Sequence, residues 1–168
     1  MSTYRINGPW RGTLAVISRP RGGDWLEDDV RAWKNGGLDV IVSLLTKEEE
    51  AGFDLSAEKT TCEKQGLQFF SLPITDLGVP SSRAHTLELL SWLEQLLNGG
   101  KSVGIHCRQG IGRSGMIAIS LLLMSGMNAA KAFEIVGRAR GLAVPETQEQ
   151  RDWVLEFGNE VAPSVTQP

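Results

Sequence analysis

The chain has 168 residues, of which 41% are hydrophobic, and its formal net charge is -3. This length and composition suffice for one hydrophobic core without disulfides or a structural metal, and the negative charge disfavours nucleic acid and anionic membranes as partners. The two cysteines cannot build a disulfide framework, and no apolar run approaches the roughly 18 residues of a membrane span. We therefore expect a cytoplasmic monomer that uses no cofactor and no metal.

Short runs of branched apolar residues, each followed by turn or capping residues, predict four buried strands. The runs are residues 14–17, 40–45, 67–72 and 103–105. Helical patterns fill the intervals at 24–35, 56–65 and 82–98, and the first of them opens on an apparent capping box, Asp24 with Glu27. Three further helices follow the last strand, at 113–125, 128–140 and 146–161.

Strands that alternate with helices are typical of a mainly parallel sheet covered on both faces. The pattern predicts an α/β fold with a sheet of about four to five strands flanked by helices and a helical cluster at the C-terminal end. No repeat or linker divides the chain, so we expect a single domain over residues 1–161 and a flexible tail at 162–168.

Residues 103–115 run from a predicted strand through a glycine-rich loop into an apolar helix. Ligands of open α/β sheets bind at the carboxyl ends of strands, and Cys107 stands where this strand ends. Glycines permit a tight turn, so successive N–H groups and the positive end of the next helix can face one point. The sequence therefore predicts a phosphate-binding loop made of Arg108, Gln109, Gly110, Ile111, Gly112 and Arg113.

The residue types in this loop favour nucleophilic catalysis. Helix N-termini and nearby cations favour the thiolate form of a cysteine, so we expect Cys107 to be an activated nucleophile. The planar fork of Arg113 can hold two phosphate oxygens, which a lysine cannot copy. Ser114 places a hydroxyl near the sulfur, and His106 is predicted to anchor the loop by a hydrogen bond to backbone.

Two other phosphate-binding motifs compete with this interpretation. Residues 110–115 fit the dinucleotide pattern G-x-G-x-x-G, but Arg113 would occupy the tight turn, and the acid about 20 residues later, Glu134, lies in a helical stretch. The Walker P-loop fails because no Gly-Lys-Ser/Thr follows at the required spacing.

The segment from His106 and Cys107 to Arg113 and Ser114 resembles the HCxxGxxRS signature of the protein tyrosine phosphatase superfamily. The compact size and the sequence of residues 110–114 are similar to the small dual-specificity members, including the kinase-associated type, with a similar layout over about residues 13–158. The resemblance implies a phosphocysteine intermediate.

Cysteine attack on a phosphate monoester requires an acid that protonates the departing oxygen. Asp76 is the candidate, because it lies in a loop after the third strand, between two prolines. The resemblance implies a general acid roughly 30 positions before the nucleophile, and Asp76 precedes Cys107 by 31. The alternative is an aspartate that only satisfies local turn amides.

Several weaker candidates remain open. Gln150 or Gln148 is interpreted as a water-positioning residue or as an exposed helix face. Residues 46–50 either border the pocket or form a capped helix start. Arg19 and Arg21 are candidates for contact with a phosphopeptide.

The sequence thus predicts a phosphatase whose partner is a phosphorylated protein bearing phosphotyrosine, and it leaves open whether phosphoserine and phosphothreonine are also substrates. Three alternatives are a phosphoinositide or RNA-phosphate phosphatase, a non-catalytic phosphate-binding pseudophosphatase, and an arsenate reductase. The last normally needs resolving cysteines, and only Cys62 is present besides Cys107.

Overall fold

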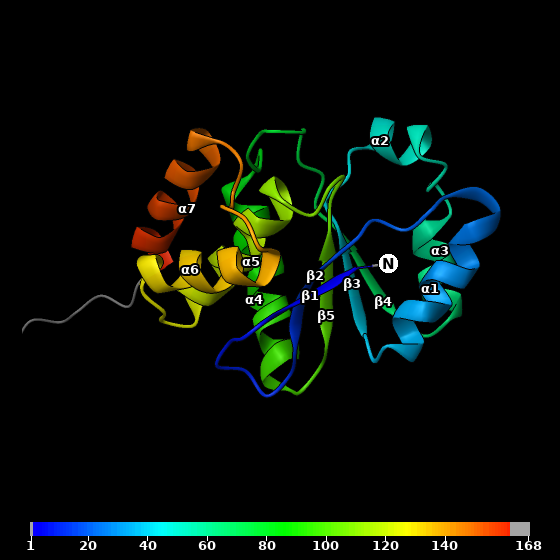
Figure 1. Cartoon of the computed structure of the whole chain (residues 1–168), viewed down its shortest axis with the longest axis horizontal. Helices are drawn as coiled ribbons and strands as arrows, with labels where there is room; N and C mark the ends of the chain where they lie inside the picture. The colour runs from blue at the N-terminus through cyan, green and yellow to red at the C-terminus, as the bar shows by residue number, and fades with distance from the viewer. Residues whose placement is uncertain (1, 162–168) are drawn as a thin grey trace, which may run out of the picture.

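The computed structural model describes residues 2–161 and has a five-stranded sheet between two layers of helices (Figure 1). The sheet order is β1-β2-β5-β3-β4; β1 is antiparallel to β2 and all other neighbours are parallel. The bounds are β1 (Thr3–Ile6), β2 (Leu14–Ile17), β3 (Val40–Ser43), β4 (Gln68–Ser71) and β5 (Val103–His106). The α/β prediction is confirmed, and the predicted tail at 162–168 lies outside the described residues.

The helices form two layers of unequal size. One face of the sheet packs against α1 (Leu26–Asn35) and α3 (Glu58–Lys64), and the other against α4 (Arg83–Asn98) and the C-terminal cluster. That cluster consists of α5 (Gly112–Met124), α6 (Ala129–Arg140) and α7 (Gln148–Val161). Burial explains the arrangement, because α5 is buried along almost its whole length and forms the centre of the larger core.

Strand β1 was not predicted from the sequence, and the helix at residues 46–50 was predicted only as one of two alternatives. Strand β1 alternates exposed and inward residues, and only Ile6 is buried, so it lacks the apolar run of a central strand. The short helix α2 (Lys47–Gly52) contains mostly charged residues, and it lies at the carboxyl edge of the sheet (Figure 1).

The predicted capping box at Asp24 and Glu27 is wrong. The chain enters through a 3₁₀ turn, Gly23–Trp25, and α1 begins only at Leu26, with no side-chain cap. Gly23 has a φ of 58°, so the chain turns at this residue, and Asp24 lies inside the 3₁₀ turn rather than at the N-cap of α1. Among residues 2–161, no helix combines the length and apolarity that a bilayer crossing requires.

Candidate active site

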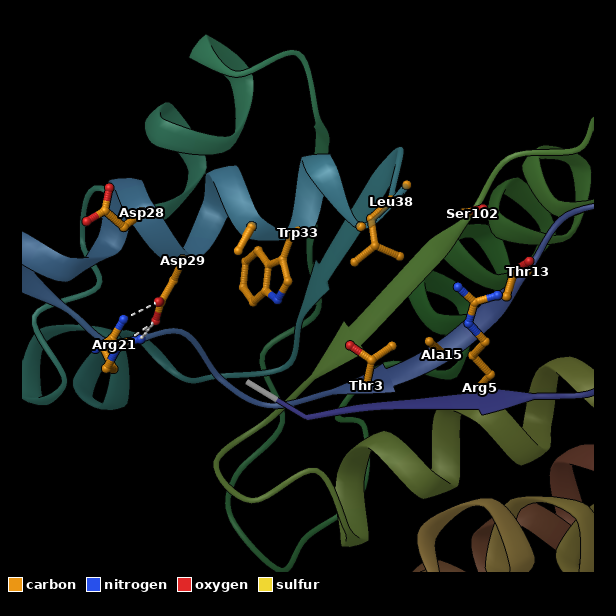
Figure 2. A pocket seen from close by; sticks show the side chains of 13 residues that line it. Thr3, Arg5, Thr13, Ala15, Arg21, Asp28, Asp29, Trp33, Leu38 and Ser102 are labelled. Carbon is orange, nitrogen blue, oxygen red and sulfur yellow. Dashed lines mark hydrogen bonds and ion pairs between the residues drawn. The ribbon is translucent and has the colours of Figure 1, made fainter.

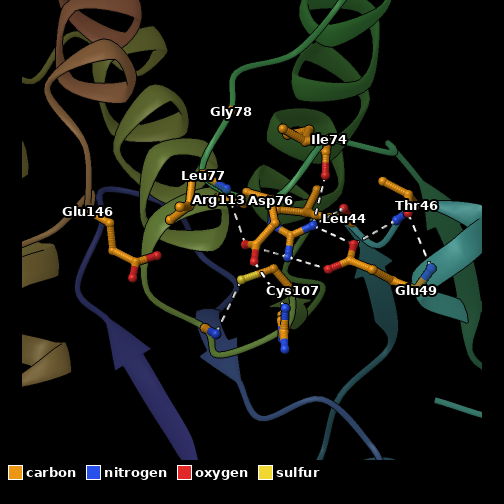
Figure 3. A network of polar contacts seen from close by, with 12 residues as sticks. Leu44, Thr46, Glu49, Ile74, Asp76, Leu77, Gly78, Cys107, Arg113 and Glu146 are labelled. Atoms are coloured by element: carbon orange, nitrogen blue, oxygen red, sulfur yellow. Dashed lines mark hydrogen bonds and ion pairs between the residues drawn. The ribbon is translucent and has the colours of Figure 1, made fainter. Parts of the chain in front are cut away.

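The site residues predicted from the sequence lie close together at the carboxyl edge of the parallel strands. Strand β5 lies in the middle of the sheet between β2 and β3, and the loop that follows it leads directly into α5. The segments after β3 and β4 reach the same edge, so they bring α2 and the loop of Asp76 to the loop of Cys107 (Figure 3).

The loop around Cys107 has the geometry of an anion cradle. The Cys107 side chain is almost completely buried, and the N–H of Gly110 donates to its Sγ at 3.2 Å. Gly110 has a φ of 66°, a conformation that favours glycine, and a Cβ at this position would lie 3.2 Å from Cγ1 of Val16, so little room remains for a side chain. Arg140, at the end of α6, donates to the Gly110 carbonyl and supports the loop from outside.

Arg113 is fully buried, and Glu49 occupies one edge of its guanidinium group. Glu49 accepts from Nη1 at 2.6 Å and from Nη2 at 2.9 Å, and the carbonyl of Ile74 accepts from Nη1 at 2.8 Å. With Glu49 on the Nη1–Nη2 edge, the Nε–Nη2 edge is the one from which Arg113 can grip two phosphate oxygens.

Electrostatics keep this buried arginine charged. Burial acts against the charge, but the hydrogen bonds to Glu49 and the charges of Cys107, Glu49 and Asp76 outweigh it and raise the pKa of Arg113 above its usual value. The hydrogen bonds from Arg113 in turn lower the pKa of Glu49. The pair is therefore an ionised one, and it fixes the orientation of the guanidinium group.

Asp76 lies on the opposite side of the same guanidinium group. Its Oδ1 accepts from Nη2 of Arg113 at 3.0 Å, and its Oδ2 lies 3.4 Å from Nη1 of Arg108 (Figure 3). Its side chain is 41% exposed, and the next residue, Leu77, has a φ of 61°. Asp76 also accepts the N–H of Leu77, so the predicted turn contact exists beside the contacts to Arg108 and Arg113.

Residues 46–50 satisfy both of the interpretations that the sequence left open. Thr46 and Glu49 form a capping box at the start of α2, and the same Glu49 carboxylate reaches Arg113. The sequence shows the capping pattern, but only the fold shows that β3 directs this helix start at the catalytic loop.

His106 anchors the loop through a side chain, and the predicted hydrogen bond to backbone is wrong. Its Nε2 lies 2.7 Å from Oε1 of Glu58, on α3, and both side chains are buried. Its ring also stacks on Trp33 of α1, with ring centroids 5.9 Å apart. The ring faces the helix layer rather than the loop backbone, because β5 directs alternate side chains to opposite faces of the sheet.

Gln150 is buried beneath the Asp76 loop. Its Nε2 donates to the Gly78 carbonyl at 2.9 Å, and its Oε1 accepts from the N–H groups of Glu146 and Thr147. The side-chain amide of Gln150 thus connects the start of α7 to the Asp76 loop. These hydrogen bonds are all to backbone groups. Gln148 is exposed and bonds Asp152.

The remaining candidates divide between this site and other regions. Arg19 and Arg108 both lie against the ring of Phe53, at 3.9 and 5.9 Å from its centroid, beside the catalytic loop. Burial and the charge of Arg108 lower the pKa of Arg19. Arg21 is instead paired with Asp29 of α1, so it is not part of this group.

The other loop residues also lie at this edge of the sheet. The Ser114 hydroxyl is buried and has no partner among residues 2–161. Gln109 is exposed, Ile111 is half-buried, and a Cβ on Gly112 would meet the side chains of Glu146 and Gln150. The sequence left the role of Glu49 open and did not indicate those of Glu58 and Arg140, because each acts across a long sequence separation.

Fold and site together define a class: a cysteine-based phosphatase with the compact layout of the dual-specificity enzymes. The family model described as "Polymorphic toxin system, DSP-PTPase phosphatase" matches residues 15–127, and the chain belongs to this family of phosphatases.

Individual relatives agree with this assignment. Rat cyclin-dependent kinase inhibitor 3 is 24% identical over 139 residues, which are 82% of this chain and 65% of the rat protein, so the chain spans less than two thirds of that relative. The solved structure of Tk-PTP in the active form is 32% identical, with a TM-score of 0.75, over 94% of this chain and 97% of that one.

Two more distant structures share the fold. Kinase-associated phosphatase has a TM-score of 0.83 at 20% identity over 96% of both chains. PTPMT1 in complex with PI(5)P has a TM-score of 0.76 at 17% identity, over 95% of this chain and 96% of that one.

Proposed function

We propose that this phosphatase hydrolyses phosphate monoesters on proteins through a phosphocysteine intermediate, with phosphotyrosine as a substrate and phosphoserine or phosphothreonine in addition. The observation that carries the proposal is the convergence of a cysteine, an arginine and an aspartate. Arg113 Nη2 and Asp76 Oδ1 are 3.0 Å apart, and the Gly110 N–H donates to the Cys107 sulfur at 3.2 Å.

The geometry supports a two-step reaction. The Cys107 thiolate attacks phosphorus, while Arg113 and the loop N–H groups bind the equatorial oxygens and Asp76 protonates the departing oxygen. Asp76, now a carboxylate, then takes a proton from the water that cleaves the phosphocysteine. The buried Ser114 hydroxyl is available to stabilise the thiolate as it leaves phosphorus.

The surrounding residues hold these groups in place. Glu49 orients Arg113, the pair of His106 and Glu58 supports the start of the loop, and Gln150 positions the Asp76 loop. Since phosphate must use Nη2 of Arg113, substrate binding replaces the contact that Asp76 makes there and moves the acid toward the leaving group.

A second candidate function is hydrolysis of phosphoinositides. The two arginines at Phe53 provide positive charge beside the catalytic loop for a second phosphate, and PTPMT1, which shares the fold, has been solved with PI(5)P. The protein substrate remains the first proposal, because the only extra cation within the loop itself is Arg108.

The test compares phosphotyrosine peptides, phosphothreonine peptides and phosphoinositides at equal concentration with purified protein. We expect the peptides to be turned over faster, and intact-protein mass spectrometry after rapid quenching to detect a phosphoryl group on Cys107. The control is Cys107→Ser, which keeps the shape of the loop but carries a hydroxyl that is hardly ionised. Substantial turnover by this variant would contradict the covalent mechanism, and a preference for phosphoinositides would favour the second candidate.

We further propose that the enzyme acts as a monomer in the cytoplasm and needs no metal. Its two cysteines are both free. Light scattering after gel filtration gives the oligomeric state, and unchanged turnover in the presence of a chelator is the expected result.

A further inference from the structure

A group of positively charged side chains lies beside the catalytic loop, around the ring of Phe53. The guanidinium group of Arg19 lies 3.9 Å from the centroid of this ring, and that of Arg108, the residue after the nucleophile, lies 5.9 Å from it. We call these three residues the Phe53 patch. Because Nη1 of Arg108 is 3.4 Å from Oδ2 of Asp76, the patch borders the proposed general acid.

Arg19 has one hydrogen-bonding group that is not used within the protein. Its Nη1 donates to the carbonyl of Pro20 at 3.2 Å, and its Nε is buried. Its Nη2 is not enclosed, and among residues 2–161 it has neither a hydrogen-bond acceptor nor an ion-pair partner. The charged Nη2 group is therefore available to an acceptor oxygen from outside the chain.

The segment that carries Arg19 is fixed to its neighbours. Two residues later, Arg21 donates from its backbone and its guanidinium group to the buried carboxylate of Asp29 on α1 (Figure 2). The N–H of Gly23 donates to the carbonyl of Asp54 at 3.1 Å, which attaches the same segment to the loop after α2. A side chain on a fixed support loses less conformational entropy when it binds a ligand.

Helix α2 sets the separation between the Phe53 patch and the catalytic arginine. Glu49, on this helix, holds Arg113, and its carbonyl accepts the N–H of Phe53 at 2.9 Å. Residues four apart in a helix lie on the same face, about 5 to 6 Å from each other. The side chains that hold Arg113 and Arg19 are therefore neighbours on one helix face, separated by about one or two residues of an extended peptide.

The charges around Arg19 favour a single carboxylate as its ligand. Burial and the charge of Arg108 lower the pKa of Arg19, whereas the charges of Glu58 and Glu49 act in the opposite direction. Arg108 itself is partly balanced by Asp76. The surplus positive charge of the patch is therefore small, and it matches a carboxylate better than a second phosphate, which carries about −1.5 to −2 charge at pH 7.

We propose that Arg19, supported by Phe53, is a specificity-determining residue that binds an aspartate or glutamate about one or two positions away from the phosphorylated residue of the substrate. The carboxylate of that acidic residue accepts from Nη2 of Arg19, and Arg108 contributes positive potential. This inference rests on the proposed function, since it requires a phosphorylated protein as the substrate.

The test measures peptide binding to Cys107→Ser by isothermal titration calorimetry, because this variant is expected to hold the substrate without turnover. The probes are phosphotyrosine peptides with alanine at the other positions, in which glutamate or glutamine is placed in turn at each of the two positions on either side. At one or two of these positions we expect the glutamate peptide to bind about three- to tenfold more tightly than the glutamine peptide. The ratio of the two Kd values is the readout, since a general loss of affinity cancels in it.

Two variants and one matched control, each combined with Cys107→Ser, locate the contact. Arg19→Gln should bring the ratio at the selective position to about one, since the charged donor is removed. Phe53→Leu keeps an apolar side chain but removes the ring beneath Arg19, so it should lower the ratio at the same position, and it provides a second test if Arg19→Gln does not fold. Arg11→Gln is the control, because Arg11 is exposed and precedes β2 at the opposite edge of the sheet, and it should leave the ratio unchanged.

Three results would overturn the proposal. Equal Kd values for the glutamate and glutamine peptides at all four positions would refute the carboxylate contact and leave the proposed protein substrate intact. Equal losses of the ratio in Arg19→Gln and Arg11→Gln would show only a long-range effect of charge. If no peptide binds but a short-chain phosphoinositide does, the proposed function fails together with this inference, and the second candidate function replaces it.

Discussion

At the scale of single residues, the site depends on how two carboxylates, those of Glu49 and Asp76, share the guanidinium group of Arg113. Glu49 holds one edge of Arg113, Asp76 accepts from Nη2, and in the proposed mechanism an incoming phosphate competes with Asp76 for this nitrogen. An arginine is required because a lysine ammonium cannot present two separate edges to a carboxylate and a phosphate at once. The role of Asp76 follows from this position, and it can be tested separately from that of the nucleophile.

Replacing Asp76 by Asn should slow hydrolysis of phosphopeptides by about 10² to 10⁴, the usual contribution of general acid catalysis. Aryl phosphates with good leaving groups should be affected less, since they depart without a proton. The measurement is kcat for both substrate types, in wild type and variant. Equal losses on both would mean that Asp76 is only a turn residue.

The two cysteines should differ in reactivity. Burial, together with the charges of Glu58 and Glu63, raises the pKa of Cys62 to about 12, so at neutral pH this residue is a thiol. We expect iodoacetamide at pH 7 to modify Cys107 first, as read by peptide mass spectrometry, and phosphate to slow that modification. Preferential labelling of Cys62 would contradict the assignment.

At the scale of elements, two helices that lie outside the catalytic loop support it. Helix α2 carries Glu49 at its third position, and helix α7 carries Gln150 beneath the Asp76 loop. Both side chains reach the site from elements far away in the sequence, so each can be altered while the loop itself is kept.

The Glu49→Gln variant removes the negative charge of this side chain but keeps its role in the capping box of α2. Glutamine is accepted at this position of a capping box, so α2 should persist, whereas the charged hydrogen bonds to Arg113 are lost. We expect kcat/KM to fall by about 10- to 100-fold, the equivalent of one hydrogen bond to a charged group. Glu48→Gln, on the exposed side of the same turn, is the matched control and should change little. If both variants behave alike, Glu49 does not orient the arginine.

Gln150→Ala should lower the free energy of unfolding by about 1 to 3 kcal/mol, because the Gly78 carbonyl and two N–H groups lose their partner. The variant should also slow the hydrolysis of phosphopeptides more than that of activated aryl phosphates, because the Asp76 loop loses the hydrogen bond that holds it in place. Urea unfolding and the ratio of the two rates provide the readouts. The exposed Gln148→Ala is the control, and an equal effect of the two changes would argue against a positioning role.

The sequence predicted much of this fold because central strands and amphipathic helices have strong local patterns. The strand 14–17 was predicted with its observed bounds, and Ser82 and Asn128 cap α4 and α6 at the predicted starts. Strand β1 was missed because its stability comes from pairing with β2 rather than from its own apolar content. The catalytic loop was predictable because its residues are consecutive, whereas the contacts of Glu49, Glu58 and Arg140 depend on the sheet order.

At the scale of the whole molecule, an ion pair ties the segment after β2 to helix α1. Asp29 is buried and accepts from both the backbone N–H and the guanidinium group of Arg21. The side-chain hydrogen bonds from Arg21 outweigh burial and lower the pKa of Asp29 below its ordinary 3.8. A carboxylate with a lowered folded-state pKa stabilises the fold above its unfolded pKa, and this contribution is lost as the pH falls through the folded-state value.

Asp29→Asn should therefore be less stable than wild type at pH 7, and the difference should shrink as the pH falls below about 4. Thermal unfolding at a series of pH values measures this directly. The neighbouring Asp28→Asn is the control, because Asp28 and its partner Arg31 are both exposed. A constant difference between wild type and Asp29→Asn across the acid range would contradict the linkage.

Arg140 links parts of the molecule that are distant in the sequence. Its guanidinium group lies 3.7 Å from the ring centroid of Tyr4 on β1, and it also donates to the carbonyl of Gly110 in the catalytic loop. In evolutionary terms, we expect the edge strand β1 and the catalytic loop to be under shared selection. Among homologues, positions 4 and 140 should change together, and a lineage that replaces the aromatic ring should also replace the arginine.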